Sequence, residues 1–183
     1  MITAIIIIAV VVLLVLWIIS VQRKFVNAEE LTKNAMSQIG VQQSSRWDAL
    51  TALVELIKSY NEHEYNTLRD VIAARTGIDS NSTAEQAQAQ EDLLQKALVQ
   101  VRAISEQYPT LKADSMYNKT MDSVNTYENQ VRMSRMTYND TVTRYNRMVR
   151  QIPDSIVAAI FHFAEKQYLK EDSGKKDMPS LKI

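Results

Sequence analysis

The two histidines, His63 and His162, are the side chains of this 183-residue sequence best suited to acid–base or metal chemistry. A di-iron site in a helical bundle needs two Glu-x-x-His motifs on facing helices, and neither histidine follows a glutamate at that spacing. Glu62, His63 and Glu64 are consecutive, so their side chains fan around a helix. His162 and Glu165 share one helical face and supply only half a site.

Other catalytic arrangements have no support in the sequence. A serine or threonine nucleophile would need a histidine as its base, and no Gly-rich loop is present to bind a phosphate. Cysteine is absent, which excludes cysteine nucleophiles, disulfides and zinc–thiolate sites. We therefore expect no catalysis, no metal and no cofactor.

A different polar pattern follows residues 115–152, where side chains at a 3-4 spacing predict one long helix. A packed helix normally places apolar residues on such a stripe. Here the stripe and its edge contain Glu128, Arg135, Tyr138, Asn139, Tyr145 and Asn146. Because a buried charge is costly unless it is paired, we expect partners on a facing helix. The available ones are Arg46, Glu64 and Arg75.

We call these nine residues the polar seam, and two interpretations of it stay open. In the first, it is a hydrogen-bond network that fixes the register of the helices, as one buried Asn does in a coiled coil. In the second, it lines a binding cleft inside the bundle. The tyrosines suit both, since each offers apolar area and a hydroxyl that needs a partner.

The elements that position the seam follow from composition. Only three Gly and three Pro are present, whereas strands and hairpins need turn residues about every ten positions, so the fold class is expected to be all-α. Lys+Arg and Asp+Glu balance at 21 each, so no nucleic-acid partner is expected.

An uncharged apolar segment, residues 2–19, predicts a transmembrane helix, since about 18 to 20 helical residues cross a hydrocarbon core of roughly 30 Å. Trp17 lies near one end of it, and Arg23 and Lys24 follow. A signal peptide cleaved near Ala28 is the alternative, but no basic residue precedes the apolar run. Because positive residues stay on the cytoplasmic side, we expect the N-terminus outside the cell and the remaining chain inside.

The remaining chain is expected to form long helices. Residues 25–76 contain Gly40 as the only helix-breaking residue, so one helix is predicted there. Residues 77–83 form a turn cluster, and Ser82 and Glu85 predict a capping box for a second helix that starts near residue 83 and ends at Tyr108-Pro109. Its first turns are polar, so only its second half is expected to pack.

After the third helix, at 115–152, a short apolar segment at 155–169 is expected to dock on the bundle. The sequence thus predicts an anchor at 1–24 and an antiparallel bundle of long helices at 25–169. An extended coiled coil is the alternative architecture. Residues 170–183 have mixed charge without periodicity, which predicts a disordered tail.

Several stretches of the sequence resemble the LemA family of bacterial membrane proteins. They are IGVQQSSRWDAL at 39–50, LVELIKSYNEHE at 53–64, TLRDVIAAR at 67–75, SEQYPTLKAD at 105–114 and YENQVRMSRMTYNDTVTRYN at 127–146. The family usually has Trp, Pro and Phe where Met36, Thr51 and Ile152 stand here, and these are changes in packing. The resemblance implies a single-pass protein of the bacterial inner membrane with a bundle of long helices, and it implies no reaction.

Three functional hypotheses follow. In the first, the chain is a membrane-anchored scaffold whose partners are the lipid bilayer, further copies of itself and an unidentified protein. In the second, it is a binding module that takes a small ligand or a peptide at the polar seam. In the third, which the residues support least, it is an enzyme that depends on His63 or Glu64.

Overall fold

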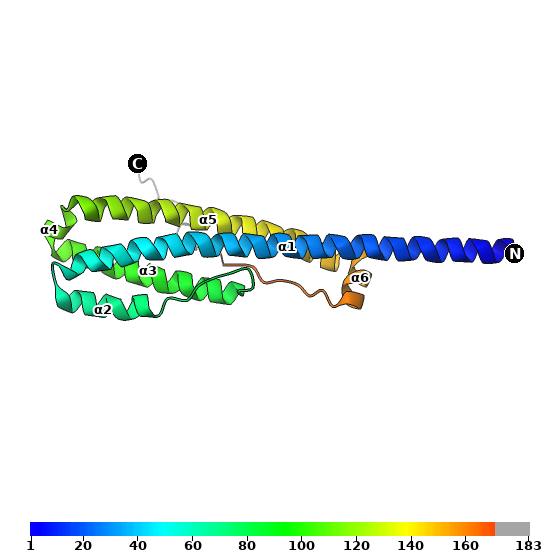
Figure 1. Cartoon of the computed structure of the whole chain (residues 1–183), viewed down its shortest axis with the longest axis horizontal. Helices are drawn as coiled ribbons and strands as arrows, with labels where there is room; N and C mark the ends of the chain where they lie inside the picture. The colour runs from blue at the N-terminus through cyan, green and yellow to red at the C-terminus, as the bar shows by residue number, and fades with distance from the viewer. Residues whose placement is uncertain (171–183) are drawn as a thin grey trace, which may run out of the picture.

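The computed structural model describes residues 1–170, and every regular element in that range is a helix (Figure 1). The helices are α1 (Ile2–Lys58), α2 (Glu62–Ala73), α3 (Ala84–Gln107), α4 (Pro109–Lys112), α5 (Ser115–Arg150) and α6 (Asp154–Phe161). The prediction of an all-α fold, with a long apolar N-terminal helix and a helical bundle, is confirmed.

Helix α1 is continuous over 57 residues, a length of about 85 Å at 1.5 Å per residue. Its N-terminal part projects from the molecule alone, and the other helices gather around its C-terminal part (Figure 1). Within residues 1–170, α1 is the helix long and apolar enough to cross a membrane, and its most apolar stretch is not buried by the rest of the protein.

The prediction of one helix over residues 25–76 is wrong, because the chain turns back after Lys58. The side chain of Asn61 caps α2 by accepting hydrogen bonds from the backbone N–H groups of His63 (2.8 Å) and Glu64 (3.4 Å). This reversal brings Leu68 of α2 into the same core as Ile57 of α1. A straight continuation of α1 would have left the apolar face of α2 in water, which is the reason for the break.

Contacts between the helices define their directions. Helix α5 pairs with α1 along most of its length, and Arg46 contacts Glu128 whereas Phe25 contacts Tyr145. The residue numbers change in opposite senses, so α1 and α5 run in opposite directions. Helix α3 runs in the same direction as α1.

The core is a ribbon of three buried clusters along α1 rather than a single centre. The cluster farthest from the N-terminus is formed by α1 to α5 around Trp47 and Leu98. A middle cluster contains Met36 and Tyr138, and a third, nearest the projecting part of α1, contains Phe25 and Val157 of α6. The pairing of α1 and α5 is therefore common to the whole bundle, while its other layers change along the axis.

Two expectations for α3 need correction. The helix begins where it was predicted, but its capping box joins Thr83 and Gln86 instead of Ser82 and Glu85. Its first turns are not merely polar, because Ala84, Ala87 and Glu91 are buried. The small alanine side chains let α3 approach α1, and the glutamate is paired inside the core.

The loop before α3 crosses α1 at Gly40. A Cβ atom at this position would lie 1.9 Å from the carbonyl oxygen of Ile78. Gly40 is thus a contact point between helix and loop, in addition to being a weak helix former.

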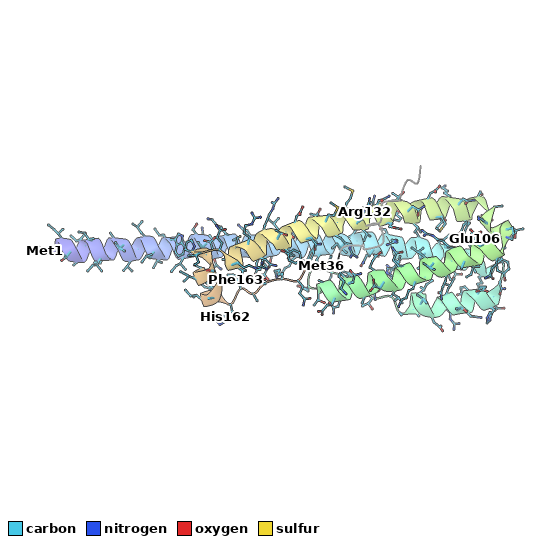
Figure 2. The ribbon with its side chains drawn as sticks, turned by 180° about the vertical axis from the view of Figure 1, so that it is seen from behind. Met1, Met36, Glu106, Arg132, His162 and Phe163 are labelled. Carbon is cyan, nitrogen blue, oxygen red and sulfur yellow. The ribbon has the colours of Figure 1, made fainter. Side chains whose placement is uncertain are left out.

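Beyond α5 the chain forms α6 and then turns back at His162, whose φ of 59° lies in the left-handed region. Residues 163–170, which we call the strap, then run along α1 and α5 without regular structure (Figure 1). Figure 2 shows His162 and Phe163 near the base of the bundle and Met36 farther along it. The tail predicted at 170–183 lies outside the described residues except for Lys170.

Candidate functional site

The two Tyr-Asn pairs of α5 face the strap, and the asparagines bind its backbone. Asn139 donates a hydrogen bond to the carbonyl oxygen of Leu169 (3.0 Å) and accepts one from the N–H of the same residue (3.0 Å). Asn146 makes the same pair of hydrogen bonds with Lys166, both at 2.9 Å. Each amide thereby satisfies both backbone groups of one strap residue, as a neighbouring β-strand would.

The heptad spacing of the pairs has a geometric explanation. Seven residues of α-helix rise about 10.5 Å, and three residues of extended chain span about 10 Å. Asn139 and Asn146 are seven residues apart, while Leu169 and Lys166 are three apart. The spacing of the two asparagine amides along α5 therefore matches the spacing of every third residue in an extended peptide.

Two further side chains of the seam extend this contact. The hydroxyl of Tyr138 donates to the carbonyl oxygen of Gln167 (3.1 Å), and Arg135 donates to the carbonyl oxygen of Lys170. Arg135 also donates to Oε1 of Gln88 on α3 (2.8 Å). The seam thus binds four backbone carbonyl groups between residues 166 and 170, whatever side chains the peptide carries.

Tyr145 supports the strap through its ring. The ring packs edge-on against Phe25 of α1, with centroids 6.0 Å apart, and the ammonium of Lys166 lies 5.1 Å from its centroid. Burial, and secondarily the negative charge of Glu29, raise the pKa of Tyr145 to about 12. The phenol therefore stays neutral at physiological pH.

The strap also offers side chains that fit particular positions. Leu169 is 3% exposed and packs in the cluster that contains Met36, and Phe163 stacks on Phe25 at a centroid distance of 4.8 Å. Glu165 accepts two hydrogen bonds from Arg150, which hold the pKa of its carboxyl below the usual value. The strap thus has packed apolar residues six positions apart, with charged residues between them.

Open space remains on both sides of the strap. A groove of about 480 Å³ lies between α1, the loop before α3 and the strap, with Thr32, Asn81 and Gln167 in its lining. A second hollow of about 500 Å³ is lined by Thr143, Arg147 and Tyr168. The strap is therefore reached from solvent along both edges.

The other part of the seam is a buried ionic cluster. Arg46 is 0% exposed, and its guanidinium donates to Glu91 at 2.6 Å and to Glu128 at 3.1 Å. Gln43 donates to Glu91 and to the carbonyl oxygen of Ala87. This cluster joins α1, α3 and α5 at one level.

The sequence was compared with models of known protein families. A model of the LemA family matches residues 35–182. The chain belongs to the LemA family. The matched region includes the buried ionic cluster, the Tyr-Asn pairs and the strap. A search among curated proteins gave no match.

Two predicted members of the seam lie elsewhere in this LemA fold. Arg75 pairs with Asp48 (2.7 Å) and Ser44 (2.6 Å) of α1, outside the buried cluster. Glu64 lies in the first turn of α2, where its N–H is capped by Asn61. Both were assigned to the seam from a helix that was expected to continue straight, and the break after Lys58 moves them away from it.

Sequence reasoning missed several partners of the seam, among them Glu91, Gln88 and the backbone of the strap. Glu91 was detectable, because it continues the 3-4 spacing of Ala84 and Ala87. The backbone of the strap was not detectable, since a carbonyl or N–H group has no sequence signature. Within residues 1–170, no three His, Asp or Glu side chains are close enough together to hold a metal ion.

Proposed function

We propose that this chain is a membrane-anchored interaction protein without catalytic activity, whose bundle binds an extended peptide segment. The observation that carries the proposal is the pair of amides, Asn139 and Asn146, each bound to both backbone groups of one strap residue. Binding an extended peptide through its main chain, with pockets for alternate side chains, is a common mode of peptide recognition.

The first candidate for the bound peptide is the strap of a second copy. We call the surface of α1 and α5 that the strap covers the seat. The strap of a second copy fits the seat because its sequence is the same as that of the chain's own strap. Confinement of copies in one membrane also raises their effective concentration. Exchange of straps between copies would produce a self-associating scaffold. An extended segment of another protein with the same spacing of apolar residues is the second candidate.

The proposed location is the bacterial inner membrane, with α1 as a single-pass anchor. Residues 2–19 supply the apolar length, and Trp17 lies where an indole prefers the interface. Arg23 and Lys24 immediately follow the span, which favours a cytoplasmic bundle and an external N-terminus. No role for nucleic acid or a cofactor is proposed.

A synthetic, fluorescently labelled peptide of residues 163–170 tests the proposal on the full-length protein in detergent. We expect saturable binding by fluorescence anisotropy, and tighter binding to the variant Leu169→Asp. That substitution places a charge in the buried seat of the chain's own strap, so the strap competes less with the added peptide. The double variant Asn139→Ala/Asn146→Ala should lose most of the binding.

Asn125 and Asn129 provide the matched control, because both are exposed asparagines of α5 that form no hydrogen bond with the strap. The double variant Asn125→Ala/Asn129→Ala should bind the peptide as the parent does. Absence of binding even to Leu169→Asp, or equal binding by both double variants, would contradict the proposal.

A further inference from the structure

Helix α6 has an apolar surface that the described protein leaves uncovered. Val157 and Ala158 are buried against α1 and α5, whereas Ile156, Ile160 and Phe161 are 55%, 56% and 45% exposed. Ile156 and Ile160 are four residues apart, so they occupy one face of the helix. This face points away from the bundle core.

The packing of α6 on α1 fixes its height relative to the proposed membrane span. Its buried residues belong to the cluster of Val21 and Phe25, which Trp17 and Ile18 also contact. Val21 and Phe25 follow the last residue of the apolar run, Ile19, by about 3 Å and 9 Å along the helix axis. The headgroup layer on each side of a bilayer is roughly 5–8 Å thick. Helix α6 is therefore level with the headgroups.

The orientation of α6 also fits a position in the headgroup layer of the bilayer. Figure 1 shows α6 lying across the long axis of α1, whereas α2, α3 and α5 run along that axis. When α1 crosses a membrane, a helix transverse to it lies close to the plane of the bilayer. Amphipathic helices in that position bury their apolar face at the boundary of headgroups and acyl chains.

Exposed cationic residues are present at the same level. Arg23 and Lys24 of α1 and Arg147 in the last turn of α5 are exposed, and within residues 1–170 none of the three forms an ion pair. Basic side chains next to an apolar helix favour an anionic lipid surface.

We infer that α6 is a second membrane-contacting element, which inserts Ile156, Ile160 and Phe161 into the lipid interface beside the span. The inference rests on the proposed membrane span of α1 and adds a lipid contact that is independent of peptide binding. It gives the bundle two points of attachment, so that its rotation about the axis of α1 is restricted.

The absence of cysteine allows a direct test. Single cysteines are introduced by Val12→Cys in the span, Ile160→Cys in α6 and Met133→Cys on α5, and each is labelled with a polarity-sensitive dye. Met133 is the matched control, because it is 67% exposed and lies far from the span. Each protein is reconstituted in vesicles of phosphatidylethanolamine and phosphatidylglycerol, with and without nitroxide-labelled lipids.

We expect blue-shifted emission and nitroxide quenching at positions 12 and 160, and neither effect at 133. Lipids with the nitroxide near the headgroup should quench position 160 more strongly than lipids with the nitroxide deep in the acyl chain. Ile156→Cys serves as a second probe of α6 and should behave in the same way.

Other outcomes separate the two proposals. Quenching at 12 without quenching at 156 and 160 would overturn the lipid contact of α6 and leave the anchor intact. A blue shift at 160 without quenching would also overturn it, since another protein surface would then cover the helix. Absence of quenching at position 12 would overturn the anchor, and the inference with it.

Discussion

At the scale of single residues, the side chains of the polar seam have two different structural roles. Arg46 pairs with Glu91 inside the bundle and with the partly exposed Glu128, which joins three helices, whereas Asn139 and Asn146 bind the backbone of the strap. The register-fixing interpretation concerns the ionic cluster, the binding interpretation concerns the Tyr-Asn pairs, and both stay predictions. The sequence predicted that these polar residues need partners, because burial makes an unpaired charge or amide costly. It did not predict which partners, since that choice depends on where each helix ends.

Removal of Arg46 should destabilise the bundle strongly. The variant Arg46→Ala leaves the buried carboxylate of Glu91 without its guanidinium, so we expect the free energy of unfolding to fall by about 3–5 kcal/mol. Chemical denaturation followed by Trp47 fluorescence measures this in a Trp17→Phe background, because Trp47 is buried beside the cluster.

Two controls define the origin of that loss. Arg132→Ala removes an exposed arginine of α5 and should change the free energy of unfolding by less than about 0.5 kcal/mol. The double variant Arg46→Met/Glu91→Leu should recover much of the stability, because a buried ion pair is often replaceable by apolar residues. Equal stability of Arg46→Ala and Arg132→Ala would show that the cluster does not hold the helices together.

At the scale of elements, the sequence predicted the helix ends that carry a recognisable signal and missed the ends that do not. The C-terminal end of α3 and the two ends of α5 were predictable, because Pro109, Asp114 and Pro153 mark them in the sequence. The break between α1 and α2 was missed, since its N-cap, Asn61, lies in a stretch without Gly or Pro. The strap was not predictable as an extended segment, because its conformation is imposed by the asparagines of α5 rather than by its own sequence.

Gly40 tests the contact between α1 and the loop before α3. In an open helix, Gly40→Ala would add about 1 kcal/mol of stability through helix propensity. Because the new Cβ would meet the backbone of Ile78, we expect a loss of about 1–3 kcal/mol instead. Thermal unfolding followed by circular dichroism measures the difference.

Gly77 is the matched control for that substitution. It lies within the same loop, and a Cβ there would meet nothing within 4 Å. Gly77→Ala should therefore leave the melting temperature close to that of the parent. A stabilising effect of Gly40→Ala would mean that the loop does not press on the helix.

At the scale of the whole molecule, the protein is a rod with an apolar end and a groove beside the strap, and both features support the proposed assembly at a membrane. The all-α class was predictable from the scarcity of Gly and Pro. The projecting apolar helix was predictable from its uninterrupted run of aliphatic residues. The order in which layers cover α1 was not, because it depends on the reversal after Lys58.

Self-association through exchanged straps predicts the behaviour of two proteins in detergent. Light scattering after size exclusion should give a mass larger than one chain both for the full-length protein and for a variant lacking residues 1–24, because the seat and the strap remain in both. A truncated variant that is monomeric, beside an assembled full-length protein, would assign assembly to the membrane segment. Monomers in both cases would leave the groove for a peptide of another protein.

The continuity of α1 has a mechanical consequence. From Ser20 to Lys58 the helix extends without interruption, a lever arm of about 57 Å measured from the end of the apolar run. Transmembrane helices tilt by about 20° on average, and such a tilt displaces the far end of this lever sideways by about 20 Å. In the proposed membrane-anchored state, a change in the tilt of α1 would therefore move α2 and α4 sideways relative to the bilayer.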